Sequence, residues 1–208
     1  VKSGEALEQL GHVTFACFDT TGTLQCGDAL RPGAKETVAA LKALGVKSLM
    51  LSGDRADIAR RFADEAGIDE VRAECRPEDK SAAVEGLQAR GERVMMVGDG
   101  VNDAIALKVA DVGVAMGGKG TDIAQEAADV SLVTDDLSKL AYLKRLSVAC
   151  VRLIKTNIAI SMTINAVAIL CSVFGVLGPV SGALVHNLGS ALVILNGALL
   201  YDRKYGAS

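Results

Sequence analysis

The sequence lacks tryptophan, has no two cysteines in C-x-x-C spacing, and carries no large excess of charge of either sign. Its five cysteines, at positions 17, 26, 75, 150 and 171, therefore indicate neither a zinc knuckle nor a disulfide framework, and we expect reduced, partly buried thiols. A net charge of −3 gives no reason to expect a nucleic-acid partner. No signal peptide is recognisable, and since the chain opens with Val rather than Met, we expect a fragment or a trimmed chain.

A length of 208 residues allows one or two domains, and an apolar content of 50% is high for a soluble protein. Up to about residue 134, short apolar runs alternate with helical patterns. The predicted strands are residues 13–18, 46–51, 92–97, 112–115 and 131–133. The predicted helices are residues 34–44, 56–66, 78–89 and 102–110. Strands that alternate with helices predict an α/β fold with a doubly wound parallel sheet over residues 1–135.

Between Lys155 and Asp202 the sequence contains no Asp, Glu, Lys or Arg. This stretch is long enough for two bilayer crossings of about 20 residues each. We predict a connecting amphipathic helix within residues 136–155 and a transmembrane helical hairpin over residues 156–208. The two spans are expected at residues 156–177 and 180–201, on either side of a Gly-Pro turn. A pair of buried core helices is the alternative.

Basic residues flank both ends of this apolar stretch. They are Lys144, Arg145, Arg152 and Lys155 on one side, and Arg203 and Lys204 on the other. Because positive charge is enriched on the cytoplasmic side of membrane proteins, we expect both ends and the first domain to lie in the cytoplasm.

Four polar segments lie at the ends of predicted strands or at the start of a predicted helix. They are residues 19–23, 52–54, 77–80 and 98–103. In open α/β sheets, ligands bind beyond the carboxyl ends of the strands. We therefore expect these segments to meet in one site.

The residue types in these segments suit phosphoryl transfer. Asp19 can be a nucleophile toward phosphorus, and Lys80 offers a compact cation for the negative charge on the phosphoryl oxygens. Ser52 and the N–H group of Gly53 can hold phosphate oxygens. Mg²⁺ prefers carboxylates and water, so the sequence also predicts a magnesium site. Its ligands would be drawn from Asp19, Asp99 and Asp103.

The four segments resemble the phosphorylation domain of P-type ATPases, within the haloacid dehalogenase (HAD) superfamily. Residues 19–25 meet the family pattern D-K-T-G-T-L-T, and residues 52–54 meet T/S-G-D. Residues 77–80 meet P-x-x-K, and residues 98–107 meet G-D-G-x-N-D-A-P-A-L, with Ile105 in place of Pro. The resemblance implies a HAD-like, Rossmann-like fold and an ATP-driven reaction in which Asp19 is phosphorylated.

The resemblance also implies roles for individual residues. The expected catalytic residues are Asp19, Thr21, Lys80 and Asp99. The expected Mg²⁺ ligands are Asp19, Thr21 through its carbonyl, Asp99 and Asp103. The expected contacts to the phosphoryl group are Thr21, Gly22, Ser52, Gly53, Lys80 and Asn102.

The apolar hairpin narrows the resemblance to heavy-metal pumps. Those pumps end with two spans after the phosphorylation domain, and the last span carries a metal-binding signature followed by an Asn. Here residues 186–190 precede Asn196 with that spacing. Polar residues in a membrane span are costly and tend to be functional, although interhelical hydrogen bonding is an alternative role. The candidates for binding a transported transition-metal cation are His186, Asn187 and Asn165, with Asn157 as a further candidate for the ion path.

The chain departs from the family in three respects. Thr20 and Gln25 stand where the family has Lys and Thr, so a cation beside the nucleophile is missing. A nucleotide-binding domain, which the family places between residues 24 and 28, is missing, so we expect ATP to bind weakly through its phosphates and Mg²⁺. The actuator domain, the earlier spans and the Cys-Pro motif of heavy-metal pumps are also missing before the phosphorylation domain.

The main hypothesis is the C-terminal part of a heavy-metal-transporting P-type ATPase, surrounded by membrane lipid, with the missing N-terminal half of the pump as a partner. A membrane-tethered phosphatase of the same superfamily is the second hypothesis. Such phosphatases have an Asp at the position of Thr21 as general acid and base. A hydroxyl cannot replace it near pH 7, so phosphatase turnover by this chain should be slow. A pseudo-enzyme or remnant, motivated by Thr20 and Gln25, is the third. The transported metal, the completeness of the chain and its oligomeric state stay open.

Overall fold

The computed structural model describes residues 1–26, 28–99, 101–117, 122–134 and 136–201. The chain divides into two compact units, Val1–Ser147 and Val148–Ser208. The division falls inside a long helix, α7 (Ser138–Val173). Domain boundaries at 135/136 and 155/156 stay predictions.

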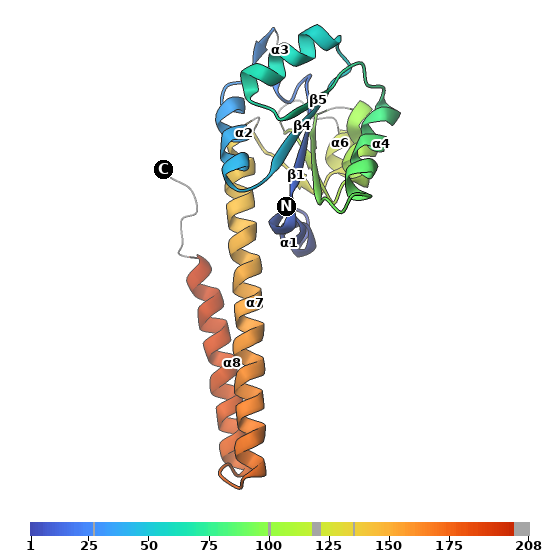
Figure 1. The fold of residues 1–208 in the computed structure, drawn as a ribbon. Helices are drawn as coiled ribbons and strands as arrows, with labels where there is room; N and C mark the ends of the chain where they lie inside the picture. The colour runs from blue at the N-terminus through green and yellow to red at the C-terminus, as the bar shows by residue number, and fades with distance from the viewer. Residues whose placement is uncertain (27, 100, 118–121, 135, 202–208) are drawn as a thin grey trace. The chain divides into compact units, whose positions relative to one another are not determined.

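The N-terminal unit is built on a six-stranded sheet with the strand order β5-β4-β1-β6-β7-β8 (Figure 1). All the pairings in this sheet are parallel, which confirms the predicted doubly wound sheet. The strands are β1 (Phe15–Asp19), β4 (Lys47–Leu51), β5 (Glu70–Arg72), β6 (Val94–Gly98), β7 (Val112–Ala115) and β8 (Val130–Ser131). A separate antiparallel pair, β2 (Gln25–Cys26) and β3 (Ala29–Leu30), follows β1 directly.

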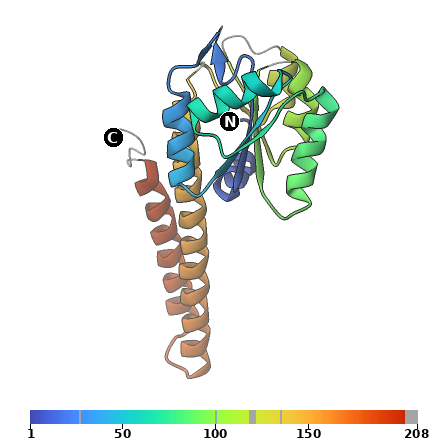
Figure 2. The same ribbon diagram turned by 45° about the horizontal axis from the view of Figure 1, so that its top comes forward.

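Helices cover both faces of this sheet, as a parallel sheet requires. Figure 2 shows the strands of the N-terminal unit between α2 on one side and α4 on the other. The helices of this unit are α1 (Gly4–His12), α2 (Ala34–Ala43), α3 (Ala56–Ala66), α4 (Pro77–Gln88), the short 3₁₀ helix η1 (Val101–Asp103), α5 (Ala104–Val109) and α6 (Asp122–Ala127).

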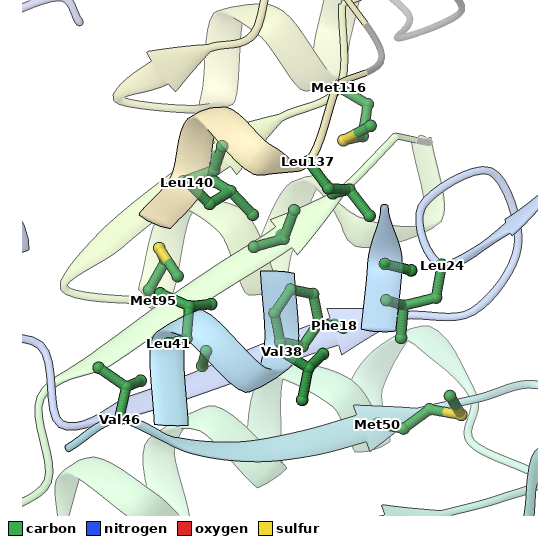
Figure 3. Close-up of a cluster of buried hydrophobic side chains, with 14 of the residues drawn as sticks. Phe18, Leu24, Val38, Leu41, Val46, Met50, Met95, Met116, Leu137 and Leu140 are labelled. Atoms are coloured by element: carbon green, nitrogen blue, oxygen red, sulfur yellow. The ribbon is translucent and has the colours of Figure 1, made fainter. Parts of the chain in front are cut away.

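Side chains of the central strand alternate between two cores. Ala16 and Phe18 pack into one core with α2, α3 and the start of α7, and Figure 3 shows Phe18 in this core. Phe15 and Cys17 pack into the other core with α4 and α5. All five residues of β1 are buried because both faces of the strand are covered. Burial on both sides explains why this strand appears in the sequence as an unbroken apolar run.

Aspartates that precede three strands link those strands to their neighbours at the amino edge of the sheet. Asp69, before β5, accepts the N–H of Ser48 at 3.0 Å. Asp111, before β7, accepts the N–H of Val94 at 2.9 Å, and Asp129, before β8, accepts the N–H of Gly113 at 2.9 Å. Each carboxylate therefore satisfies a backbone donor at the start of the adjacent strand.

The first helix is held at both ends. Ser3 caps the amino end of α1 by accepting the N–H of Ala6 at 3.0 Å. At the carboxyl end, the buried ammonium of Lys144 donates to the carbonyls of Leu10, Gly11 and Val13 at 3.1, 2.9 and 2.7 Å. A cation at a helix carboxyl end is favourable, and all three donors of this ammonium are satisfied.

The structure differs from the sequence predictions where apolar patterns are short. The helices α1 and α6 and the strands β2, β3 and β5 were not predicted. The predicted helix over residues 102–110 is divided into η1 and α5. β5 contains one apolar residue, Val71, and forms through pairing with β4 rather than through a periodic pattern of its own.

The C-terminal unit consists of the larger part of α7 and of α8 (Pro179–Tyr201). Both helices are long and apolar enough to cross a membrane, and their most apolar stretches are 0% and 6% buried. Exposure of these stretches argues against the alternative of buried core helices. Arg203 and Lys204, which were expected to flank the second span, lie outside the described residues.

Candidate active site

The three central strands end next to one another. β1 ends at Asp19, which is in register with Leu51 at the end of β4, and Phe18 is in register with Val97 of β6. Ser52 and Asp99 directly follow these neighbouring strands. The parallel register thus brings three of the four polar segments to one edge of the sheet, and α4 supplies the fourth.

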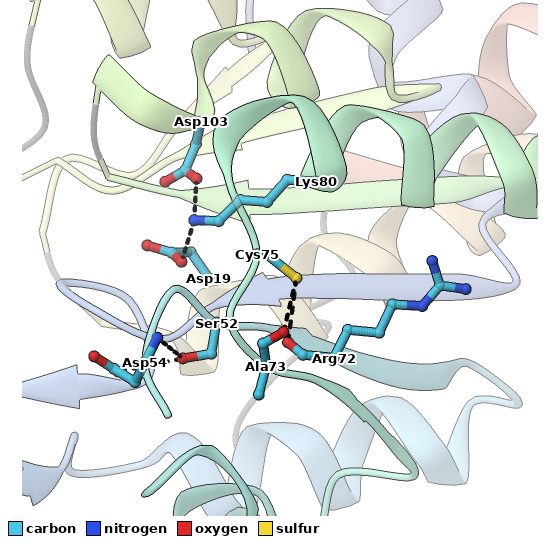
Figure 4. Close-up of polar contacts among 8 residues, drawn as sticks. All are labelled: Asp19, Ser52, Asp54, Arg72, Ala73, Cys75, Lys80 and Asp103. Carbon is cyan, nitrogen blue, oxygen red and sulfur yellow. Dashed lines mark hydrogen bonds and ion pairs between the residues drawn. The ribbon is translucent and has the colours of Figure 1, made fainter. Parts of the chain in front are cut away.

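Asp19, Lys80 and Asp103 form a buried charged group at this edge (Figure 4). The Lys80 ammonium lies 2.6 Å from Asp19 Oδ1 and 2.7 Å from Asp103 Oδ1. The three side chains are 7%, 8% and 1% exposed, in the order Lys80, Asp19, Asp103. One cation is therefore shared by two carboxylates that are largely shielded from water.

Local structure at the start of α4 positions Lys80. Pro77 is the first residue of the helix, and Asp79 accepts the N–H of Arg76 at 2.9 Å in a capping box. These contacts fix the first turn, from which Lys80 reaches Asp19. The amino end of a helix also favours negatively charged ligands.

A third carboxylate adds to the negative charge. Oxygen atoms of Asp19, Asp99 and Asp103 lie within 4.8 Å of one another. Three carboxylates face one ammonium here, so the group has surplus negative charge and an oxygen-rich surface. The donor set fits Mg²⁺, which binds a few carboxylate oxygens and completes its octahedral shell with water.

The titration behaviour of these groups reflects the surplus charge. Burial and the neighbouring Asp103 raise the pKa of Asp19 to about 7, against the opposing effect of Lys80. Burial, and then Asp103, also raises the pKa of Asp99. Burial alone would lower the pKa of Lys80, but the carboxylates of Asp19 and Asp103 outweigh it and raise that pKa. A bound divalent cation would relieve this repulsion.

A cavity of about 250 Å³ opens over the charged group. Its lining contains most of the residues that the sequence predicted, namely Asp19, Thr21, Gly53, Lys80, Asp99, Asn102 and Asp103. Pro77 and Cys75 complete the lining. Cys75 was not predicted, since it lies just after β5, a strand without a sequence signal. Most of the lining residues that the structure describes have charged or polar side chains, and none of them is aromatic.

Two predicted phosphate contacts lie beside the cavity rather than in its wall. Ser52 is buried, and its hydroxyl pairs with Asp54, accepting the Asp54 N–H at 3.0 Å and lying 3.2 Å from Asp54 Oδ2. Gly22 has a φ of +74°, and a Cβ atom built on it would lie 1.3 Å from Asp99 Oδ2. The carboxylate of Asp99 therefore rests against Gly22, which explains why glycine is required there.

The residue after the nucleophile does not line the cavity. Thr20 is 0% exposed, and its hydroxyl has no hydrogen-bond partner within the part of the chain that the structure describes. The carbonyl of Thr20 accepts the N–H of Gln25 at 2.8 Å, which closes the turn after β1. Gly100, within the fourth segment, lies outside the described residues.

Polar side chains of the C-terminal unit pair across the two helices. His186 Nδ1 lies 3.4 Å from Asn165 Oδ1, and Asn196 Nδ2 donates to Asn157 Oδ1 at 2.6 Å. Asn187 is exposed on α8. The structure thus brings His186 and Asn165 together, and these contacts are compatible with both a metal site and interhelical hydrogen bonding.

Known proteins share this architecture and sequence. A model of the family described as haloacid dehalogenase-like hydrolase matches residues 2–111, more than half of the chain. The chain is 44% identical over 205 residues to a manganese-exporting P-type ATPase of Mycobacterium leprae, covering 95% of this chain and 28% of that protein. It is 44% identical over 195 residues to a zinc-transporting ATPase of Bacillus subtilis, covering 92% of this chain and 30% of that protein.

A solved structure of a metal-transporting ATPase also resembles this chain. A zinc-transporting PIB-type ATPase in the E2.Pi state matches with a TM-score of 0.90 and 26% identity, over 96% of this chain and 52% of that one. The chain thus spans about a third or less of the length of the two curated relatives. The resemblance to heavy-metal P-type ATPases is confirmed by these matches, and together with the two apolar helices they identify a membrane protein.

Proposed function

Because the chain belongs to the haloacid dehalogenase-like hydrolase family, we propose that it transfers the γ-phosphoryl group of ATP to Asp19 as part of a heavy-metal-exporting P-type ATPase. The observation that carries the proposal is the buried group of Asp19, Lys80 and Asp103, with Asp99 beside it, in the lining of one cavity. This group supports the proposal because it would supply a nucleophile, a cation and a set of metal ligands within one site.

In the proposed reaction, a carboxylate oxygen of Asp19 attacks the γ-phosphorus in line with the bond to ADP. The new P–O bond forms as the bond to the ADP oxygen breaks, and ADP leaves with that electron pair. The Lys80 ammonium lies 2.6 Å from the nucleophile and stabilises negative charge on the phosphoryl oxygens. Gly53 and Asn102, which line the cavity, would bind the same oxygens. Ser52 and Gly22 lie beside the cavity, and Gly22 leaves room for the Asp99 carboxylate.

The expected cofactor is Mg²⁺, held by Asp19, Asp99, Asp103 and the carbonyl of Thr21. When bound, it neutralises surplus charge among the carboxylates and favours approach of the anionic phosphate. The chain's own residues perform the remaining tasks, since Lys80 keeps Asp19 oriented and the buried sheet edge excludes bulk water.

The transported ion would interact with the C-terminal unit. Relatives are named as exporters of manganese and zinc, and imidazole suits borderline transition metals. His186 and Asn165, 3.4 Å apart, are the proposed ligands, with Asn187 adjacent in sequence. Flanking basic residues such as Arg152 and Lys155 favour a cytoplasmic position for the N-terminal unit. The proposed partners are ATP, membrane lipid and the remaining part of a pump.

The proposal is tested on the full chain in detergent micelles with millimolar [γ-³²P]ATP and Mg²⁺. We expect acid-stable, hydroxylamine-labile label on the wild type and none on Asp19→Asn. Asp57→Asn is the matched control, since Asp57 lies on the exposed surface of α3 and pairs with Arg55. Equal labelling of wild type and Asp19→Asn contradicts the proposal.

One observation favours a phosphatase as the second candidate. The short hairpin of β2 and β3, closed by the hydrogen bond from Arg31 N–H to the Leu24 carbonyl at 2.7 Å, occupies the position where the resembled pumps carry a nucleotide-binding domain. A cavity lined by Lys80 and three carboxylates that could hold a metal suits small phosphoesters. Steady hydrolysis of p-nitrophenyl phosphate that is lost in Asp19→Ala, without label from ATP, supports this candidate. Absence of both activities supports the pseudo-enzyme.

A further inference from the structure

Arg31 reaches back from the end of β3 to the turn that follows the nucleophile. Its Nε donates to the Thr23 carbonyl at 2.7 Å, and its Nη2 donates to the Gly22 carbonyl. Its backbone N–H also donates to the Leu24 carbonyl at 2.7 Å. One residue thus binds three consecutive carbonyls, two of them through a rigid planar guanidinium that a lysine cannot replace.

The turn held in this way sets the position of two proposed metal ligands. Thr21, whose carbonyl is one of them, lines the cavity immediately before Gly22. The carboxylate of Asp99 packs against the Cα atom of Gly22, as shown by the 1.3 Å separation of Asp99 Oδ2 from a Cβ built there. A change in the path of residues 22–23 would therefore displace both the Thr21 carbonyl and Asp99.

Arg31 also adds positive charge at an edge where it is scarce. Among the described residues of the cavity wall, Lys80 is the one cation, facing three carboxylates. Burial and Asp103 raise the pKa of Asp99, and Arg31 and Lys80 are the cations that oppose this shift. Thr20, next to the nucleophile, contributes no charge.

We propose that Arg31 is a positioning residue of the phosphoryl-transfer site, whose guanidinium fixes the turn at Gly22 and Thr23 so that the Thr21 carbonyl and Asp99 face Mg²⁺. This inference rests on the proposed function, because it assigns a task toward the cofactor of that same site. Arg31 does not line the cavity among the described residues, so it acts through the turn rather than on the phosphoryl group. Residues that orient metal ligands typically change metal affinity ten- to a hundredfold when removed.

The test measures binding rather than turnover. Beryllium fluoride with Mg²⁺ imitates an aspartyl phosphate and should protect the folded chain. Protection is read from Cys17, which is 0% exposed in β1, by its alkylation in urea and peptide mass spectrometry. The Mg²⁺ concentration that gives half of the full protection, at fixed beryllium fluoride, is the quantity compared.

We expect Arg31→Ala to raise this half-saturating Mg²⁺ concentration about tenfold, with little change of Cys17 protection in EDTA. Arg31→Lys keeps the charge without the planar guanidinium, so its half-saturating Mg²⁺ concentration should lie between those of the wild type and Arg31→Ala. Arg55→Ala is the matched control, because Arg55 is exposed and pairs with Asp57 at 3.2 Å. It should behave as the wild type.

Two results overturn the inference. The first is an unchanged half-saturating Mg²⁺ concentration in Arg31→Ala. The second is a loss of Cys17 protection in EDTA that accounts for the whole effect, which would make Arg31 a structural link of the β2–β3 hairpin. If beryllium fluoride and Mg²⁺ do not protect the wild type, the proposed function fails together with this inference.

Discussion

Both edges of the sheet in the N-terminal unit carry aspartates, but their carboxylates have different neighbours at each edge. At the amino edge, Asp69, Asp111 and Asp129 each accept a backbone N–H of a neighbouring strand. At the carboxyl edge, Asp19, Asp99 and Asp103 crowd together around Lys80. The first edge uses carboxylates to join strands, and the second keeps them close in spite of their repulsion.

The pKa shifts express this difference. Although burial opposes it, hydrogen bonds from Val94, Gln88 and Arg93 lower the pKa of Asp111. Burial and Asp103 instead raise the pKa of Asp19 to about 7. The charges of Asp69 and Asp111 thus stabilise the amino edge, whereas the carboxyl edge keeps repelling carboxylates together. Under the proposed function, this loss of stability serves to hold a metal and a phosphoryl group.

The largest effect should come from Lys80, the cation shared at the carboxyl edge. Lys80→Met leaves Asp19 and Asp103 buried without a partner, so the free energy of unfolding should fall by about 3–5 kcal/mol. Phosphorylation by ATP should fall at least about a hundredfold. The matched change at the other edge is Lys42→Met, whose ammonium pairs with Asp69 and is 60% exposed. Urea unfolding read at Cys17 should show a loss below about 1 kcal/mol for Lys42→Met.

The next effect compares the loss of one aspartate from each edge of the sheet by its change in the free energy of unfolding. Asp111→Ala removes the acceptor of the Val94 N–H, the Gln88 amide and the Arg93 guanidinium, which lie at 2.9, 3.0 and 2.7 Å. The buried Val94 N–H then loses its acceptor, whereas Gln88 keeps the Val109 carbonyl, so the free energy of unfolding should fall by about 1–3 kcal/mol. Asp99→Ala relieves repulsion and should leave stability in EDTA unchanged or higher. A larger loss in Asp99→Ala than in Asp111→Ala would reverse the comparison.

Glycines with positive φ give a smaller and more local test. Gly22 and Gly33 have φ values of +74° and +80°, so alanine should cost about 1 kcal/mol at either position. A methyl group on Gly33 meets nothing within 4 Å, whereas one on Gly22 collides with Asp99. Gly22→Ala should therefore reduce labelling of Asp19 at least tenfold, and Gly33→Ala should leave it unchanged. Equal labelling of the two variants would show that Asp99 does not need its place against Gly22.

The last effect is the dependence of stability on pH. Hydrogen bonds from Lys42 and Ser48 lower the pKa of Asp69, and the pKa of Asp111 is also lowered. For a depressed pKa the contribution is present above the ordinary value of 3.8 and is lost as the pH falls through the lower, folded-state value. In EDTA the sign reverses for Asp19, since a pKa raised to about 7 makes stability rise as the pH falls from 7 toward 3.8.

These opposite slopes are measured by urea unfolding between pH 3 and 8 in EDTA, read by far-UV circular dichroism because thiol alkylation fails at acidic pH. Asp111→Asn should flatten the loss at low pH, and Asp19→Asn should remove the gain below pH 7. Parallel curves for wild type and both variants would contradict the assignment of the shifts to these two edges.

Sequence could predict the carboxyl edge because each central strand is an apolar run that ends in a short polar segment. Asp19, Ser52 and Asp99 could be placed together from that pattern and from the parallel arrangement alone. The hairpin could be predicted as well, because 46 residues without Asp, Glu, Lys or Arg, from 156 to 201, leave few alternatives.

The amino edge could not be predicted, because an Asp before a strand looks like any turn residue. Asp111 acquires its meaning from Val94, which lies 17 positions away. Cys75 was missed because β5 has little apolar pattern, and Arg31 because its partners are backbone carbonyls, which leave no mark in a sequence. Lys144 was assigned to the membrane flank, yet its ammonium binds the carboxyl end of α1.

The most direct measurement compares the unfolding free energies of wild type and Asp19→Asn at pH 7, first in EDTA and then with Mg²⁺ and beryllium fluoride. If the carboxyl edge is built for a metal and a phosphoryl group, Asp19→Asn is at least as stable as the wild type in EDTA. With the ligands present the order reverses, because the wild type gains about 2.7 kcal/mol at a hundred times the dissociation constant and the variant gains nothing. A variant that is less stable in EDTA, or that gains as much as the wild type from the ligands, would contradict the account.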